Sequence, residues 1–191
     1  MKESISKRYS RTIDGKYIID ITAGSVSDLY NSFDRHTPYS RKELDQGLVE
    51  YITDSASELG NNEFTIQIDL LEPPDESMKD RIRTSISSYF LYLKTIELNQ
   101  MGRKMRVSLI YLAIGIVILY FSVYVNRQLA SDTTVLMTVF SEGLTVAAWV
   151  SLWEALATFL VNWTPYRRKI KLYQYIASSP VVFINSKLET Q

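Results

Sequence analysis

Glu154 is the residue whose type and position most strongly suggest chemistry, because it is a carboxylate inside an otherwise apolar stretch. Counted back from Trp163 along a helix, it lies about 13 Å inside the membrane interface at which we place that tryptophan. An ionised carboxylate at such depth is costly, so it should face a partner or a cavity, or be protonated. Tyr111, a few residues into the first apolar stretch, could donate a hydrogen bond to it. Glu154 therefore predicts either a proton- or cation-linked site or a polar contact that fixes helix packing.

The other polar candidates predict no catalytic centre. Glu142 stands near the outer end of the second apolar stretch, where we expect it to pair with Arg127 or to reach water. His36 is the only histidine, and it stands in a polar turn without the Gly-x-Ser-x-Gly motif of a serine hydrolase. We therefore expect a surface histidine and a protein that is not an enzyme.

The composition and the acidic residues predict no metal and no cofactor. The chain has no cysteine, which excludes thiolate zinc sites, and its seven glycines form no phosphate-binding loop. The acidic run consists of Asp69, Glu72, Asp75, Glu76 and Asp80. It surrounds the start of a predicted helix, where the helix dipole favours negative charge, and it lacks the spacing of a calcium-binding loop.

Small residues recur at every seventh position in both apolar stretches. They are Ser108, Gly115 and Ser122 in the first and Ser141, Ala148 and Ala155 in the second. This spacing keeps small side chains on one seam of a left-handed helix crossing, which lets two backbones approach closely. It predicts a helix contact within the chain or between copies, although small residues are also common in membrane spans.

The elements that would position these residues are two long apolar segments. Residues 107–125 hold no formal charge and, at about 1.5 Å per residue, form about 28 Å of helix, close to the roughly 30 Å core of a bilayer. The second segment, residues 135–161, is longer and holds two glutamates, and its span is placed at 141–163. With a short external loop at 126–134, the expected fold class is an α+β membrane protein with a two-helix transmembrane hairpin.

Basic residues flank both segments on one side. They are Arg103, Lys104 and Arg106 before the first, and Arg167, Arg168, Lys169 and Lys171 after the second. The connecting loop offers only Arg127, offset by Asp132. The positive-inside rule places both termini in the cytoplasm of a multi-pass plasma (inner) membrane protein, with Trp163 in the aromatic belt. We expect anionic headgroups as partners, and no nucleic acid, because no basic stripe interleaves with aromatic residues.

Outside the hairpin, which we place at residues 102–163, the sequence predicts a small cytoplasmic α/β domain over residues 1–101. Residues 164–191 follow the hairpin and should return to this domain; we call them the C-terminal return. Strands are expected at 16–22 and 63–70, where apolar residues recur or alternate. A short helix is expected within 25–33, and another that starts at Ser40 with Glu43 as a capping box. Asp75 opens a long helix that runs into the first span, with Gly102 as a possible hinge.

The C-terminal return should carry a basic interfacial helix at 166–177 and a strand near 180–185. Two strands alone make a poor sheet. We therefore predict that residues 181–184 pair with the sheet of the N-terminal domain as its third strand, with a disordered or membrane-lying tail as the alternative.

Residues 147–183 resemble the end of an uncharacterised family of bacterial two-span membrane proteins. The shared features are Trp149 and Trp153, Phe159-Leu160, Trp163-x-Pro165, Arg167-Arg168, Leu172-Tyr173 and a terminal Pro-Val strand. The resemblance implies a two-span architecture with a small cytoplasmic domain, and it implies no activity.

Two functions from different classes are consistent with these patterns. The first is a non-enzymatic membrane-anchored interaction or regulatory module, a homo-oligomer or the binder of a membrane or cytoplasmic protein through its acidic N-terminal half. That half, residues 1–100, has 12 basic and 17 acidic side chains. The alternative is a small homo-oligomeric channel or ion-coupled subunit that uses Glu154. The face of the second segment on which Glu154 lies would discriminate between them.

Overall fold

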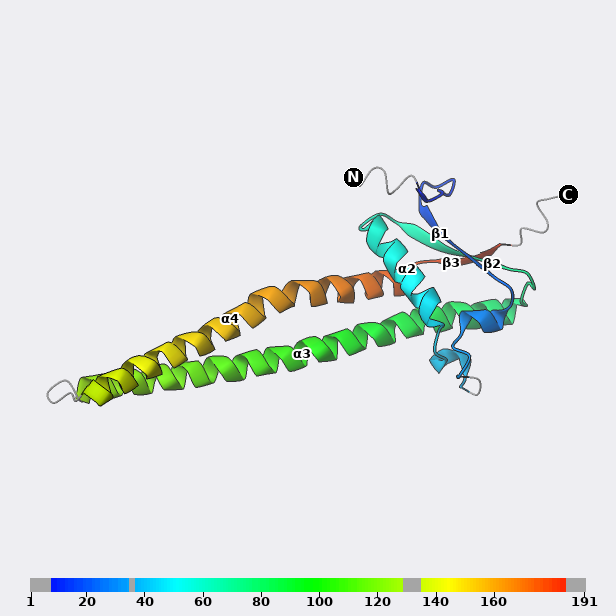
Figure 1. Ribbon diagram of the computed structural model, residues 1–191. Coiled ribbons are helices and arrows are strands. Elements are labelled where there is room, and N and C mark those ends of the chain that lie inside the picture. Colours follow the sequence, from blue (N-terminus) through cyan, green and yellow to red (C-terminus); the bar gives the residue numbers. More distant parts are fainter. Residues whose placement is uncertain (1–7, 35–36, 129–134, 185–191) are drawn as a thin grey trace. The chain divides into compact units, whose positions relative to one another are not determined.

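The computed structural model describes residues 8–34, 37–128 and 135–184, and it is mostly helical, at 69%. Figure 1 shows the order of the elements along the chain. They are strand β1 (Tyr17–Ala23), two short 3₁₀ helices (Val26–Leu29 and Tyr39–Arg41), helix α2 (Gln46–Leu59), strand β2 (Phe64–Leu70), helices α3 (Glu76–Gln128) and α4 (Val135–Ser178), and strand β3 (Val181–Ile184).

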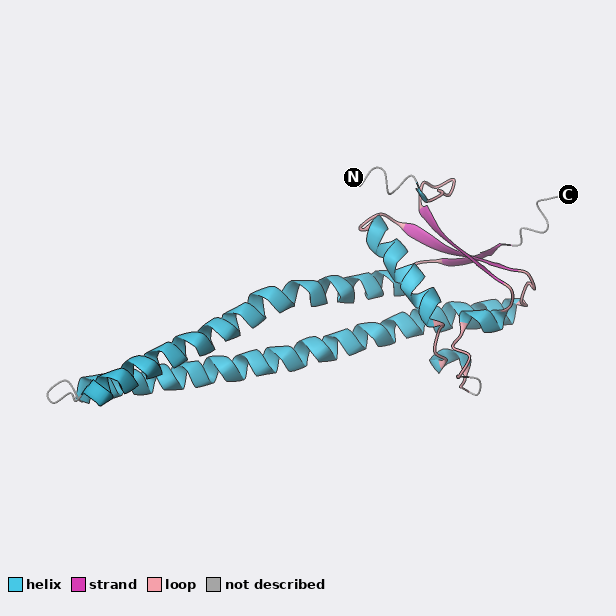
Figure 2. Cartoon of the chain, viewed as in Figure 1, coloured by secondary structure: helices cyan, strands magenta, loops and turns pink. Residues whose placement is uncertain are grey.

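The three strands form one parallel sheet in the order β1-β2-β3 (Figure 2). Ile66 of β2 lies opposite Ile19 of β1 and Val181 of β3. The backbone N–H of Ile66 donates to the carbonyl of Pro180 at 2.9 Å. The prediction that residues 181–184 complete the sheet is therefore confirmed, and β2 is the central strand.

One face of the sheet carries the core. Alternation along β1 buries Tyr17, Ile19 and Ile21, while Asp20 and Thr22 on the other face are exposed. The helices supply Ile52 and Ala56 from α2, Ile82, Ile86 and Phe90 from α3, and Ile176 from α4. The first part of α3, whose helix was expected to open at Asp75, therefore presents an apolar face to the core.

The chain divides into two compact units, which we call unit 1 and unit 2. Unit 1 comprises Met1–Thr95 and Lys169–Gln191, and it contains the sheet and its core. Unit 2 is Ile96–Arg168 and consists of the adjoining parts of α3 and α4. Both long helices therefore contribute residues to both units.

The expected fold class requires correction. The protein is mostly helical with a small parallel sheet, and within the described residues only α3 has the length and composition to cross a membrane. Among the described residues no second helix meets that criterion, so the prediction of a two-helix transmembrane hairpin is wrong. The helices differ in composition, because α4 interrupts its apolar residues with Glu142 and Glu154, whereas residues 107–125 of α3 carry no formal charge. Most of the expected connecting loop, 129–134, lies outside the described residues.

Several predicted boundaries also change. The expected capping box at Ser40 and Glu43 is wrong, because α2 begins at Gln46 and its N-cap is Asp45, whose side chain accepts from the Leu48 N–H at 3.1 Å. The expected helix within residues 25–33 is only the 3₁₀ turn Val26–Leu29. Gly102 lies inside α3, and the segment expected as an interfacial helix is the last part of α4, which contains Pro165.

Candidate functional site

The predicted small-residue seam lies where α3 and α4 pack in unit 2. The Ser108 hydroxyl donates to the carbonyl of Ala155 at 2.9 Å, and the hydroxyls of Ser122 and Thr145 are 2.7 Å apart. Ala148 and Ala155 are also buried. The side chain of Ser141 lies outside the described part of the chain. Two hydroxyl contacts therefore hold the helices together at separate levels.

Gly115 also lies in this contact, where α4 approaches it closely. A Cβ atom added to it would lie 3.2 Å from side-chain carbons of Leu152 and Ser151. A spacing of 3.2 Å is shorter than an ordinary carbon–carbon contact, so the two backbones can pack this closely only because the residue has no side chain.

The intramembrane polar candidates are not brought together. Glu154, Tyr111 and Glu142 are all exposed on unit 2. No hydrogen bond joins Tyr111 to Glu154 in the described residues, nor is there an ion pair between Glu142 and Arg127. Glu154 precedes the buried Ala155, yet it is turned away from the α3 contact because successive helical residues differ by about 100°.

The basic residues predicted as interfacial anchors are exposed. Within unit 2 these are Arg103, Lys104 and Arg106 of α3 and Arg167 and Arg168 of α4. The ammonium of Lys104 lies 5.3 Å from the ring centroid of Tyr166, so the two basic clusters meet at one end of the helix pair. Lys169 and Lys171 are also exposed and belong to unit 1, and the side chain of Trp163 is not among those described.

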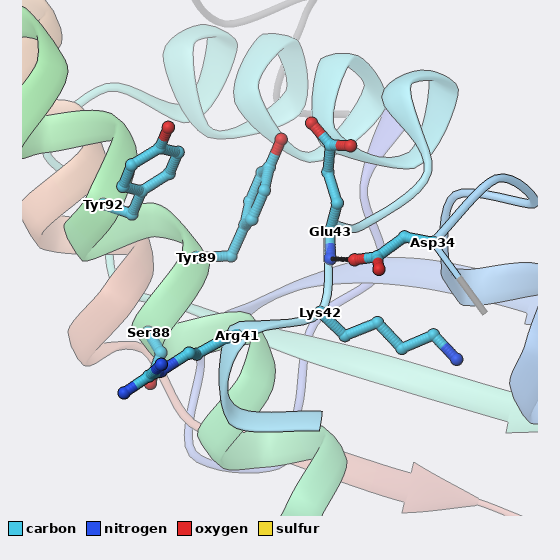
Figure 3. A pocket seen from close by; sticks show the side chains of 7 residues that line it. All are labelled: Asp34, Arg41, Lys42, Glu43, Ser88, Tyr89 and Tyr92. Carbon is cyan, nitrogen blue, oxygen red and sulfur yellow. Dashed lines mark hydrogen bonds between the residues drawn. The ribbon is translucent and has the colours of Figure 1, made fainter. Parts of the chain in front are cut away.

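Unit 1 contains a pocket of about 450 Å³ that the sequence did not predict (Figure 3). One wall is a loop that contributes Asp34, Arg41, Lys42 and Glu43, and the other is α3, which contributes Ser88, Tyr89 and Tyr92. The volume is within the roughly 300–1,000 Å³ typical of sites for small ligands.

Short polar contacts fix the loop wall. The Asp34 carboxylate accepts from the backbone N–H of Glu43 at 2.8 Å, and the Glu43 carboxylate accepts from the side-chain amide of Asn31 at 3.0 Å. Beyond them, Tyr30 and Leu44 form an antiparallel bridge that closes the base of the loop. Both carboxylates are thereby held at the pocket by the fold.

The cation of Lys42 is already engaged elsewhere. Its ammonium lies 5.1 Å from the ring centroid of Tyr30 and 5.2 Å from that of Tyr39. In Figure 3 it points away from Tyr89 and Tyr92, while the hydroxyls of these two tyrosines and the carboxylate of Glu43 point to one side. The pocket therefore has an aromatic and acidic part that Lys42 does not fill.

Two pKa shifts describe the electrostatics of this pocket. Burial raises the pKa of the Tyr89 hydroxyl, and the nearby negative charge of Glu43 adds to the effect. The hydrogen bond from Thr37 and the backbone bond from Glu43 lower the pKa of Asp34 below its ordinary value. A carboxylate at Asp34 is thus part of the folded loop.

The stability of the loop should depend on the charge of Asp34. Because folding lowers its pKa, the carboxylate stabilises the protein above its unfolded-state pKa, and this contribution is lost as pH falls through the folded-state pKa. We expect Asp34→Asn to flatten the acid side of a plot of unfolding midpoint against pH. Asp54→Asn, an exposed position on α2, is the matched control. Identical acid slopes for wild type and Asp34→Asn would contradict the assignment.

Sequence reasoning missed this pocket for a physical reason. Glu43 was assigned to a helix cap, and no functional role was predicted for Tyr89 or Tyr92. The i, i+3 spacing of Tyr89 and Tyr92 was the available signal, since it places both rings on one side of a helix. Nothing in the sequence shows that Asp34 and residues 41–43 lie against that side.

Comparisons with known proteins add no assignment, because no family model, curated protein or solved structure matches the chain. The resemblance of residues 147–183 to a two-span family therefore stays a prediction. In the described residues no group of three or more histidines, cysteines, aspartates or glutamates is arranged to hold a metal ion.

Proposed function

We propose that the protein is a non-enzymatic interaction module held at a membrane by unit 2, with unit 1 as its binding domain in the cytoplasm. The observation that carries this proposal is the distribution of polarity in unit 2. Its buried contact is made of small and hydroxyl residues, Ser108, Ser122 and Ala148 among them. Its exposed residues include many large apolar side chains, whereas a helix pair that folds in water buries such side chains.

The exposed apolar surface of unit 2 is extensive. On α3 it includes Leu109, Ile110, Ile114, Ile116, Val117, Tyr120, Phe121 and Val123, and on α4 it includes Val139, Phe140, Val146, Trp149, Val150, Trp153, Leu156 and Leu160. Only 17% of the apolar window in α3 is buried, so it does not resemble a core helix. Contiguous apolar surface beyond a few hundred Å² is rare on water-soluble monomers and marks lipid or protein contact.

Two further features support a membrane orientation. The basic clusters that meet at Lys104 and Tyr166 provide cations for anionic headgroups at one end of unit 2. Strands β1 and β3 lie in the same sheet, so the two segments that make up unit 1 form one folded domain. The excess of basic residues beside the apolar segments favours the cytoplasmic side.

One observation favours the channel alternative as a second candidate. Glu154 is exposed and turned away from the α3 contact, where it would meet a second copy of unit 2 instead of its own partner helix. Several copies would then bring their Glu154 carboxylates together. The mass of the intact protein in mild detergent tests this candidate, because a monomer would exclude it and a ring of copies would support it.

Membrane partition tests the anchor directly. We expect the protein to remain in the membrane fraction after an alkaline carbonate wash. Val117→Arg should reduce this fraction, because Val117 is 66% exposed and a cation at the centre of a membrane helix costs about 2.5–3.5 kcal/mol. Ser57→Arg adds the same charge to an exposed position of α2 and should have no effect. Release of the wild-type protein as a monodisperse soluble species would overturn the proposal.

A further inference from the structure

A tyrosine pair in unit 1 already holds an ammonium group. The rings of Tyr30 and Tyr39 lie 5.4 Å apart at an angle of 71°, and the Lys42 ammonium is almost equidistant from both, at 5.1 and 5.2 Å. An ammonium within about 6 Å of a ring centroid is attracted by the negative face of the ring. The contact shows how this fold uses two adjacent tyrosines as a cation site.

The pocket of Figure 3 contains a second pair of neighbouring tyrosines, with a more tilted arrangement. The rings of Tyr89 and Tyr92 lie 6.3 Å apart at an angle of 50°. Tyr92 is 59% exposed and Tyr89 is partly buried, and both line the pocket. No cation of the described chain lies over either ring.

Two carboxylates line the same pocket as the second pair, together with the basic side chains of Arg41 and Lys42. Glu43 lines the same pocket and points to the side of the two tyrosine hydroxyls, and Asp34 lies behind it. Both carboxylates are fixed by the hydrogen bonds of the loop, so the negative charge is held there before any ligand binds. The rise in the pKa of Tyr89 that Glu43 contributes to is consistent with negative potential at the rings.

We propose that the pocket formed by Tyr89, Tyr92, Glu43 and Asp34 binds an organic ammonium ion. The cation would lie against the two rings, with its charge compensated by Glu43. A lysine side chain of a protein partner and a free small-molecule amine share this chemistry. The inference goes beyond the anchoring function and does not depend on it, because all the lining residues belong to unit 1.

Arg41 allows a test of whether the bound ligand is a cation or an anion. It lines the pocket and is exposed, so it is a like charge for a bound ammonium and an attractive one for a bound anion. For a cation site, Glu43→Gln must weaken binding, and Arg41→Gln must leave it unchanged or strengthen it. Gln at position 43 keeps an acceptor for the Asn31 amide, so this variant removes the charge without removing the loop contact.

The experiment uses the full chain in a maltoside detergent and choline as the probe. Saturation transfer from the protein to the choline methyl protons gives the dissociation constant. The matched neutral ligand is 3,3-dimethyl-1-butanol, which has the same shape without the charge. We expect choline to bind and the neutral isostere to bind more weakly. Tyr92→Leu should weaken choline binding roughly two- to five-fold, whereas Tyr92→Phe, which keeps the ring, should retain most of it.

A second ligand distinguishes a partner lysine from a small-molecule amine, and two results would contradict the proposal. Nα-acetyl-lysine methylamide, which has a free side-chain ammonium, is titrated in parallel. Tighter binding of this compound than of choline indicates a lysine of a protein partner, and tighter binding of choline indicates a quaternary amine. The unfolding midpoint of each variant shows that unit 1 remains folded. Equal binding of choline and its neutral isostere, or a loss of binding in Arg41→Gln with none in Glu43→Gln, would overturn the proposal.

Discussion

Replacing Phe90 with alanine is expected to lower the free energy of unfolding of unit 1 by about 3–5 kcal/mol. Phe90 is fully buried at 0% exposure, and its ring lies 6.1 Å from that of Tyr173 and 6.3 Å from that of Tyr89. The truncation removes the buried apolar area of the ring and leaves a cavity between the helices and the sheet. The surrounding side chains are close-packed and can fill only part of this cavity.

The adjacent residue supplies the control. Leu91 is 45% exposed, so Leu91→Ala should change stability by no more than about 0.5 kcal/mol. Thermal unfolding of both variants, followed by circular dichroism in the same detergent, measures the difference. Comparable unfolding midpoints for the two variants would show that Phe90 is not in the core.

In unit 2 the largest effect is expected from Gly115→Leu. An added Cβ at Gly115 already meets carbon atoms of Leu152 and Ser151 at 3.2 Å, so a leucine must push α3 and α4 apart. Overpacking of this kind costs about 1–3 kcal/mol. Gly102→Leu is the matched control, because Gly102 lies in the same helix and a Cβ added to it meets no atom within 4 Å. Both variants gain the same helix propensity, so the difference between them reports packing.

Cysteine cross-linking measures this effect without interference, because the natural chain contains no cysteine. Ser122 and Thr145 have hydroxyl oxygens 2.7 Å apart, and we expect cysteines at these two positions to form a disulfide. The yield should fall strongly when Gly115→Leu is added and remain high with Gly102→Leu. An undiminished yield with Gly115→Leu would mean that the helices are not packed at this glycine.

The sheet and core of unit 1 were predictable because period-two alternation is a local property of the chain. Residues 64, 66, 68 and 70 had to share a face, and the structure buries all four. The start of α2 was not predictable in the same way. Ser40 and Glu43 have the spacing of a capping box, but Leu44 pairs with Tyr30, and this long-range contact keeps the backbone extended until Asp45.

The residues of unit 2 show a different limit of sequence reasoning. Seven-residue spacing indicated which small residues could share a seam, and Ser108 and Ala155 do lie in the contact between α3 and α4. Hydropathy alone did not establish two spans, and that class was wrong. The position of Glu154 depended on the rotation of α4, which the sequence leaves open and the packing of Ala155 decides.

The pairing of β3 with the central strand has a consequence for biosynthesis. A ribosome delivers β1, α2 and β2 early, but β3 emerges only after α3 and α4 have been translated. Until then one edge of β2 has its backbone groups unpaired, which is a template for association with other nascent chains. Messages truncated before codon 181 would therefore yield products with an open sheet, and these would be substrates for chaperones and proteases.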